Sequence, residues 1–352
     1  MLYQQDMFSI SERTVGEPLG YTIHGLWYDG SFIAEGDVMT CLKKMNDGII
    51  DCIVCSPPYY KLRKNNCEVE WSDCCFNHPC IYELGQEPST LHYIIHLQLI
   101  FKECKRVLKD SGNLFVVISD TADNGDLMIP EKFSIMMQDN GYKRKSDIIW
   151  RQNNILPKGG AAKNKKLVRD YEHVYHFVKD FNKSYFNQLY EPLSDITVKE
   201  YQTFYDKKAT KDYEKHGVQN PSKVKANIIN RNHKFAPLGG VNKYHNNKEI
   251  PSSQLASNNE YRPSNGGRLM RSVWTVNHNC LPKDILHFSA FPRELVSRLL
   301  DLGCPSDGTV LDPFLGSGTT AVVAEQKKLK WIGIEMNPEY IKATKMRLER
   351  GK

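Results

Sequence analysis

Short apolar runs recur along the chain and predict buried strands. They lie at 51–55, 114–118, 148–150, 174–178, 309–311 and 331–334. Between the first two runs, residues 90–109 place apolar side chains at near-helical spacing, which predicts a helix that ends at Gly112. Strands that alternate with helices indicate an α/β fold with a doubly wound, mostly parallel sheet, in which the apolar helix faces serve packing.

The run at 309–311 leads into a glycine-rich segment that predicts a ligand site. Asp312 follows the predicted strand, residues 316–318 (Gly-Ser-Gly) turn the chain, and Thr319 begins a helical stretch. Glycines remove side chains and allow positive φ, so a ligand can lie against bare backbone. Glu335 ends the next predicted strand, and an acidic residue about 20 positions after such a turn commonly binds ribose hydroxyls. The segment therefore predicts a nucleoside site.

Two missing signatures narrow the choice of ligand. No Gly-Lys-Ser/Thr follows the glycines, so a P-loop is not expected. The pair Gly316 and Gly318 also lacks the third glycine of the dinucleotide fingerprint. The nucleoside is therefore predicted to be neither a P-loop triphosphate nor a dinucleotide.

A second candidate site is Ser56-Pro57-Pro58-Tyr59, directly after the predicted strand 51–55. In open α/β sheets the carboxyl ends of strands line the crevice where ligands bind. Two prolines fix φ and remove two backbone donors, which leaves a rigid turn that presents carbonyls. The Ser56 hydroxyl and the Pro57 carbonyl could accept the two hydrogens of an exocyclic base amine and so localise its lone pair. Tyr59 could stack on a base turned out of the duplex.

Together these motifs resemble those of the beta-class, S-adenosylmethionine-dependent DNA amino-methyltransferases, in which the catalytic motif comes first and the cofactor loop last. The resemblance implies a Rossmann-like methyltransferase sheet with Ser56, Pro57, Pro58 and Tyr59 as catalytic residues and S-adenosylmethionine as the cofactor. It also implies three segments: 1–180 as the catalytic half of the core, 181–271 as an inserted target-recognition region and 272–352 as the cofactor-binding half.

The same resemblance implies which residues bind the cofactor. Asp37, after Gly36, matches a Gly-Asp motif near the cofactor adenine, and residues 291–296 are similar to a Phe-Pro-x-x-Leu segment. The full predicted set is Asp37, Phe291, Pro292, Asp312, Pro313, Phe314, Gly316, Ser317, Gly318, Thr319, Thr320, Glu335 and Met336. Residues 170–175 approximate the family's His-Glu-x-Ile/Val strand, but Tyr171 replaces the common histidine and receives no catalytic role.

Positive charge gathers in one part of the chain. The whole chain carries a formal charge of +6, whereas residues 206–271 hold 13 Lys or Arg against five Asp or Glu. Basic residues interleaved with tyrosines suit a DNA-contacting arm, with a solvated loop as the alternative. Arg and Asn read guanine and adenine edges well. The predicted partner is double-stranded DNA, contacted by Arg231, His233, Lys234, Arg262, Asn265 and Arg268.

Composition bounds the class of protein. A hydrophobic content of 40% can fill one large core and a smaller appendage. With no apolar run of 18 residues and no leader at the amino terminus, the chain is expected to be cytoplasmic, with no membrane partner. A cluster of potential metal ligands follows the catalytic motif: Cys67, Cys74, Cys75, His78 and Cys80. Its irregular spacing favours reduced thiols over zinc, and no metal is predicted.

Ser56 also predicts the target base. Adenine-N6 members of the family usually carry Asp or Asn at the first motif position, whereas Ser-Pro-Pro-Tyr is typical of cytosine-N4 members. Cytosine-N4 methylation is therefore predicted, with adenine-N6 methylation as the alternative activity. The alternative without enzymatic activity is a catalytically inactive DNA-binding regulator. A cytosine-C5 enzyme would need a cysteine nucleophile, but Cys80 lies away from the strand end. The expected role is restriction–modification, with a cognate endonuclease as a partner, or epigenetic marking.

Overall fold

The computed structural model describes residues 24–28, 31–64, 67–71, 80–121, 126–153, 167–191, 244–245, 248–249, 268–277 and 292–350. The chain divides into two compact units. One consists of Met1–Asn187 together with Ser272–Lys352, and the other is Gln188–Arg271. The first unit is therefore discontinuous in sequence, and its amino-terminal part extends seven residues beyond position 180.

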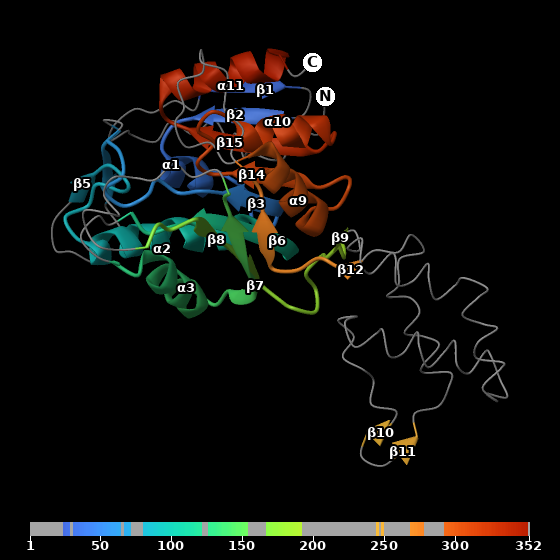
Figure 1. Cartoon of the computed structure of the whole chain (residues 1–352). Helices are drawn as coiled ribbons and strands as arrows, with labels where there is room; N and C mark the ends of the chain where they lie inside the picture. The colour runs from blue at the N-terminus through green and yellow to red at the C-terminus, as the bar shows by residue number, and fades with distance from the viewer. Residues whose placement is uncertain are drawn as a thin grey trace, which may run out of the picture. The chain divides into compact units, whose positions relative to one another are not determined.

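Strands and helices follow one another along the first unit (Figure 1). Its amino-terminal part contains β1 (His24–Tyr28), β2 (Ser31–Glu35), α1 (Val38–Lys43), β3 (Ile50–Cys55), β4 (Val69–Trp71), β5 (Cys80–Tyr82), α2 (Thr90–Val107), β6 (Leu108–Ile118), α3 (Ile129–Asp139), β7 (Lys143–Arg151) and β8 (Tyr171–Val178). Its carboxyl-terminal part contains β13 (Val273–Thr275), α9 (Arg293–Gly303), β14 (Thr309–Asp312), α10 (Thr319–Gln326), β15 (Lys330–Glu335) and α11 (Pro338–Arg350).

The two parts of this unit share one sheet. Among the described residues, nine strands pair in the order β1-β2-β15-β14-β3-β6-β8-β7-β13. Pairing is parallel from β2 through β15, β14 and β3 to β6, and again between β7 and β13. Only β1 and β8 run against their described neighbours. The predicted doubly wound, mostly parallel α/β sheet is confirmed.

Helices cover both faces of the sheet. α1, α2 and α3 pack in one layer, and α9, α10 and α11 in the other (Figure 1). Strands β3 and β14 are buried at every position. A strand covered on both faces is mostly apolar, which is why residues 52–55 and 310–311 appear as apolar runs in the sequence. No described helix is long and apolar enough to cross a membrane.

The predicted helix at 90–109 ends earlier than its sequence indicated. α2 stops at Val107, and Leu108 already begins β6, so Gly112 lies inside a strand and not at a helix end. A Cβ on Gly112 would approach the Leu108 side chain to 2.6 Å. Close packing inside the strand therefore requires glycine at position 112. A sequence pattern cannot distinguish such a glycine from one that ends a helix.

One buried polar cluster joins α9 to the sheet. Asn113 of β6 donates through Nδ2 to the carbonyls of Gly303 at 2.8 Å and Tyr185 at 2.9 Å. Its Oδ1 lies 2.8 Å from His176 Nε2. Burial lowers the pKa of His176 to about 3, so the imidazole is neutral and its Nε2–H faces the amide oxygen. The cluster thus fixes the carboxyl end of α9 against β6 and β8.

The second unit contains short paired strands. They are β9 (Tyr190–Glu191) with β12 (Arg268–Leu269), and β10 (Tyr244–His245) with β11 (Lys248–Glu249), both pairs antiparallel. Arg271 donates through Nε to Glu191 Oε1 at 2.8 Å. The two ends of the segment are therefore held together where it leaves and rejoins the core sequence.

Candidate active site

Two neighbouring strands carry the two predicted motifs to the same edge of the sheet. β14 and β3 pair in parallel with Leu311 opposite Ile53, so Asp312 and Ser56 both lie at carboxyl ends. From β14 the chain continues to β15 on one side, and from β3 it continues to β6 on the other. Ligands of open α/β sheets bind in the crevice at such a switch point. The fold thus brings together motifs from opposite ends of the chain.

Asp312 organises the loop that follows β14. Its Oδ1 accepts from the Phe314 N–H at 3.0 Å, and its Oδ2 accepts from the Thr320 hydroxyl at 2.6 Å. The carboxylate is 2% exposed. Burial, reinforced by the charge of Glu335, raises the pKa of Asp312 to about 7, although both hydrogen bonds act in the opposite direction. The loop therefore surrounds an acid that titrates near neutrality.

The glycines at 316 and 318 shape the turn as predicted. Gly316 has φ of 55° and Gly318 has φ of 76°, in the region that favours glycine. A Cβ on Gly318 would meet the Thr344 side chain at 2.4 Å. The Gly316 N–H donates to Glu335 Oε2 at 2.8 Å, and the Asn337 N–H donates to Oε1 at 2.8 Å. Glu335, whose pKa is raised by burial, thus closes the loop onto the end of β15.

Helix α11 supports this loop from behind. Thr344 donates its hydroxyl to the Gly316 carbonyl at 3.0 Å. One turn later, Arg347 donates through Nη1 to the Ser317 carbonyl at 2.6 Å, to the Ser317 hydroxyl at 2.9 Å and to the Thr319 hydroxyl at 3.1 Å. Arg347 is 2% exposed, and burial lowers its pKa to about 10. Loop carbonyls therefore point back into the helix, away from the crevice.

Sequence reasoning missed Arg347, although a signal was present. Ile341, Thr344 and Leu348 form the buried stripe of α11, and the same helical period places position 347 inside. An arginine on such a stripe has to find acceptors nearby. Here the acceptors are the Ser317 carbonyl and the hydroxyls of Ser317 and Thr319 in the glycine-rich turn.

The remaining predicted cofactor residues lie in different settings. Asp37 caps α1, where its Oδ1 accepts from the Thr40 N–H at 2.8 Å, and the preceding Gly36 N–H donates to the Glu335 carbonyl at 3.0 Å. Asp37 therefore borders the Glu335 strand end while its side chain serves a helix. Pro292 is buried as the N-cap of α9, and Phe291 lies outside the described residues.

The Ser56–Tyr59 turn follows β3 directly, as predicted. The carbonyl of Pro58 accepts from the Tyr93 hydroxyl at 2.8 Å, so this carbonyl faces α2. Gly85, with φ of 91°, packs so closely that a Cβ on it would lie 2.9 Å from the Tyr59 carbonyl. With the Pro58 carbonyl occupied, the amine acceptor expected on this turn is the carbonyl of Pro57.

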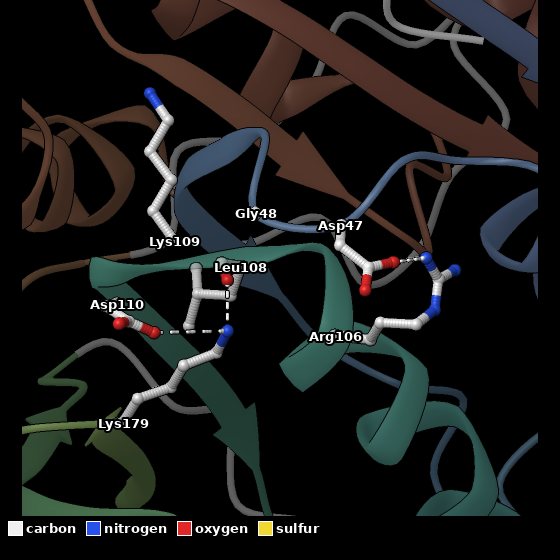
Figure 2. Close-up of a pocket in the computed structure, with 7 residues that line it drawn as sticks. All are labelled: Asp47, Gly48, Arg106, Leu108, Lys109, Asp110 and Lys179. Atoms are coloured by element: carbon white, nitrogen blue, oxygen red, sulfur yellow. Dashed lines mark hydrogen bonds and ion pairs between the residues drawn. The ribbon is translucent and has the colours of Figure 1, made fainter. Parts of the chain in front are cut away.

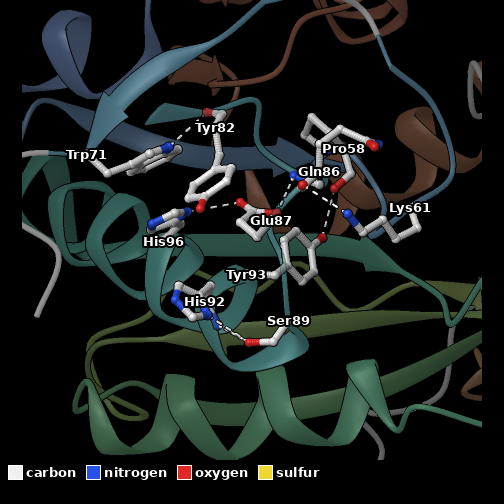
Figure 3. Close-up of polar contacts among 11 residues, drawn as sticks. Pro58, Lys61, Trp71, Tyr82, Gln86, Glu87, Ser89, His92, Tyr93 and His96 are labelled. Atoms are coloured by element: carbon white, nitrogen blue, oxygen red, sulfur yellow. Dashed lines mark hydrogen bonds and ion pairs between the residues drawn. The ribbon is translucent and has the colours of Figure 1, made fainter. Parts of the chain in front are cut away.

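A buried polar chain supports the turn from the side of α2 (Figure 3). The Gly85 N–H donates to Glu87 Oε2 at 2.8 Å, and Glu87 Oε1 lies 3.0 Å from His96 Nδ1. Both side chains are fully buried. The His96 ring stacks on Trp71 with centroids 4.0 Å apart, and Trp71 donates to the Tyr82 carbonyl at 3.0 Å. These polar contacts link β4 and β5 to the backbone that packs against the Ser56–Tyr59 turn.

Tyr59 is held by a residue from a third strand. Its hydroxyl donates to Glu172 Oε2 at 2.5 Å, and Gln152 donates through Nε2 to Glu172 Oε1 at 3.2 Å. Burial, followed by the charge of Glu172, raises the pKa of Tyr59 well above its usual value, while a hydrogen bond with Ser56 acts against this. The phenol is therefore a neutral donor. Glu172 lies in the segment 170–175 noted in the sequence, but its role was not predicted.

The predicted DNA contacts and cysteine cluster are only partly described. Arg231, His233, Lys234, Arg262, Asn265, Cys74, Cys75 and His78 lie outside the described residues. Arg268 lies in β12 of the second unit. Among described residues, no three His, Cys, Asp or Glu side chains are grouped to hold a metal ion. Cys80 is buried, and Cys67 is partly buried.

A pocket of about 500 Å³ lies at the opposite edge of the sheet (Figure 2). It is lined where β3 and β6 begin and β8 ends, by residues such as Asp47, Lys109 and Lys179. Its charges are paired: Lys109 contacts Asp51 at 2.8 Å, and Arg106 contacts Asp47 at 2.6 Å. Because ligands of this fold bind at the carboxyl ends of strands, this pocket is separate from the candidate site.

A family model decides the identification. The model described as a DNA methylase, named for N6 and N4 methyltransferases, matches residues 50–346. This chain belongs to that family. The predicted resemblance to DNA amino-methyltransferases is confirmed, and with it S-adenosylmethionine as the cofactor of that family.

Relatives of this methyltransferase span nearly its whole length. Type II methyltransferase M.XycI of Xanthomonas campestris pv. cyanopsidis is 26% identical over 91% of this chain and 88% of its own. Type II methyltransferase M.SmaI of Serratia marcescens is 24% identical over 90% of each. The solved PvuII DNA methyltransferase, described as cytosine-N4-specific, superposes with a TM-score of 0.55 at 18% identity, over 91% of this chain and 86% of that one. That likeness concerns the fold.

The residues at the strand edge fit this cofactor. S-adenosylmethionine carries positive charge and a ribose. Asp312 and Glu335 are carboxylates whose partners among the described residues are backbone N–H groups and one hydroxyl, so their charge is not neutralised by a cationic side chain. The bare backbone at Gly316 and Gly318 leaves room for a ligand beside them.

Proposed function

We propose that this methyltransferase modifies the exocyclic N4 amine of cytosine within a short duplex DNA sequence. The observation that carries the proposal is Ser56, which stands first in the catalytic turn and emerges beside Asp312 at the switch point of the sheet. A hydroxyl can accept an amine hydrogen and also donate to a neighbouring ring acceptor such as cytosine N3, whereas an ionised aspartate only accepts. Adenine-N6 methylation is the alternative within the family.

Cofactor binding is assigned to the loop after β14 and to Glu335. The carboxylate of Glu335 would receive the ribose hydroxyls, and Asp312 would place negative charge beside the cationic cofactor. The proposed pocket is completed by Asp37, Phe291, Pro292, Pro313, Phe314, residues 316–320 and Met336. When bound, the cofactor supplies an electrophilic methyl group on sulfur at the crevice between β14 and β3.

The catalytic turn activates the amine. An exocyclic amine is a weak nucleophile because its lone pair is delocalised into the base. In the proposed complex the Ser56 hydroxyl oxygen and the Pro57 carbonyl accept its two hydrogens, which localises the lone pair toward the methyl group. The amine nitrogen would take up the methyl group, the cofactor would leave as a neutral thioether, and the excess proton on the nitrogen would pass to water. The Tyr59 ring supports the base after it has left the helical stack.

Sequence recognition is assigned to the basic segment 206–271. Its net charge of +8 contrasts with a charge near −2 for the rest of the chain. Proposed contacts are Arg231, His233, Lys234, Arg262, Asn265 and Arg268. Binding to duplex DNA should weaken steeply with salt, because neutralised phosphates release counterions. The Type II names of the relatives support a restriction–modification role with a cognate endonuclease.

The base is tested by product analysis. DNA is methylated by the purified full chain, digested to nucleosides and analysed by mass spectrometry. N4-methylcytosine is the expected product, and Ser56→Ala provides a matched control that should form little of it. N6-methyladenine as the sole product would overturn the cytosine assignment and leave the family membership intact.

A further inference from the structure

Glu172 meets the catalytic turn without belonging to either predicted motif. Its carboxylate accepts the Tyr59 hydroxyl at 2.5 Å through one oxygen and the Gln152 amide at 3.2 Å through the other. Gln152 is 7% exposed and follows β7 directly. A carboxylate fixed from two sides is a rigid acceptor, because rotation about its side chain would break both hydrogen bonds.

The antiparallel course of β8 explains why a residue so distant in sequence arrives there. His173 pairs with Ile118, the last residue of β6, so β8 begins at the edge where the parallel strands end. The rings of Tyr171, His173 and Tyr175 lie against one another on one face of β8, with centroids 5.6 Å and 5.2 Å apart. Because side chains alternate along a strand, Glu172 is directed to the opposite face.

We propose that Glu172 is a positioning residue that fixes where the Tyr59 ring lies for stacking on the extruded base. This inference rests on the proposed role of Tyr59. The backbone anchors one end of the tyrosine through the turn, and Glu172 anchors the hydroxyl at the other end. A tyrosine held at both ends cannot rotate about its first side-chain torsion, so the position of its ring is fixed. Stacking depends on that position, and a misplacement of about 1 Å near the reacting atoms can cost about 100-fold in rate.

A double-mutant cycle in the full chain tests the coupling. Tyr59→Phe keeps the ring and removes the hydroxyl, whereas Glu172→Ala keeps the hydroxyl and removes its acceptor. Each variant should lower the single-turnover rate of methyl transfer about 10- to 100-fold, with unchanged affinity for S-adenosylmethionine. The double variant should be no slower than either single one, because both substitutions remove the same hydrogen bond.

Glu172→Gln is the rescue variant. Glutamine retains an oxygen that accepts from the Tyr59 hydroxyl, so the rate should stay within about threefold of the unchanged protein. Asp170→Ala is the matched control, because Asp170 lies two residues away and its carboxylate contacts Arg151 at 3.1 Å. This control should leave the rate unchanged. A rescue by glutamine would not be expected if Glu172 acted only through its charge.

Several outcomes would overturn the inference. A wild-type rate in Glu172→Ala would do so, as would rate losses of Glu172→Ala and Tyr59→Phe that multiply in the double variant. If thermal melting shows that Glu172→Ala does not fold, the cycle is run with Glu172→Gln, for which a rate as low as that of Tyr59→Phe is the contrary result. Rates are measured on whichever base is methylated, so a failed cytosine assignment leaves this test intact.

Discussion

The proposed cofactor loop (residues 312–320) and the proposed catalytic turn (residues 56–59) lie at one edge of the sheet, yet they are held in different ways. The cofactor loop is held from within the continuous segment between β14 and α11, by bonds that join Asp312 to Thr320, Gly316 to Glu335 and Ser317 to Arg347. The catalytic turn is held by Tyr93, thirty-five residues away on α2, and also by Glu172, one hundred and thirteen residues away on β8. The first region therefore depends on one segment of the chain, whereas the second also depends on how the sheet is assembled.

This difference predicts that substitutions in the two regions will have different effects. A change in the cofactor loop should disturb ligand binding within its own βαβ unit. A change around the catalytic turn should alter the geometry of methyl transfer and leave cofactor affinity intact. Four measurements test this contrast.

The largest effect is expected for Asp312→Ala. The substitution leaves the Phe314 N–H and the Thr320 hydroxyl without their acceptor and removes a negative charge beside the cofactor. Affinity for S-adenosylmethionine, measured by calorimetry, should fall about 100-fold or more. Asp301→Ala is the control, because the carboxylate of this exposed acid pairs with Lys327 at 2.6 Å. Unchanged affinity in both Asp312→Ala and Glu335→Ala would remove the assignment of the cofactor site.

Tyr59→Ala should produce the converse result. Loss of the stacking ring should lower turnover about 10- to 100-fold, because stacking of a base on an aromatic side chain is worth about 1–3 kcal/mol. Cofactor affinity should not change. Leu62→Ala, three residues away and 45% exposed, is the control. Weakened cofactor binding in Tyr59→Ala, with normal turnover at saturation, would contradict the separation of the two regions.

Arg347→Met tests the support of the cofactor loop by α11. Methionine fills a similar volume but leaves the Ser317 carbonyl and the Thr319 hydroxyl without their donor. We expect cofactor affinity about 10- to 30-fold weaker and a lower melting temperature, since unsatisfied buried groups cost about 1–3 kcal/mol each. Lys342→Met, on the exposed side of the same helix, should change neither quantity. Equal behaviour of the two variants would show that α11 is not the support.

The smallest effect concerns pH. Burial raises the pKa of Asp312 to about 7 and also raises that of Glu335, so protons compete with the cationic cofactor near neutrality. Affinity should increase as pH rises through about 7 and fall below it, by about threefold to tenfold between pH 8 and 6. Calorimetry across this range measures the slope. Asp312→Asn should bind weakly with a flatter profile, and an unchanged slope in that variant would assign the titration to another group.

The same shift affects stability in the absence of cofactor. Because the folded-state pKa of Asp312 lies above its ordinary value of 3.8, the protonated form favours folding. This contribution is fully present below about pH 4 and is lost as pH rises through about 7. In the unliganded protein the ionised Asp312 carboxylate is therefore unfavourable, and binding of a cation would offset this cost.

Sequence patterns predicted the strands, the loop and the turn because each depends on a few contiguous residues. Buried strands such as β3 and β14 are apolar at their central positions, and the glycines at 316 and 318 are required by positive φ. Gly112 misled the prediction of a helix end, since glycine can also serve close packing within a strand. Arg347 could have been found from the helical period of α11. The local pattern placed Glu172 at the Glu position of the His-Glu-x-Ile/Val segment but did not indicate that it contacts Tyr59.

The two motifs and the family can be recognised from the sequence alone, because bond geometry and hydrogen bonding over a few residues specify a turn or a loop. How these motifs are held depends on the tertiary structure. The antiparallel direction of β8 brings Glu172 to Tyr59, and the packing of α2 brings Tyr93 to the Pro58 carbonyl. Such contacts depend on strand order and direction, which arise from packing of the whole sheet and leave no trace in the spacing of neighbouring residues.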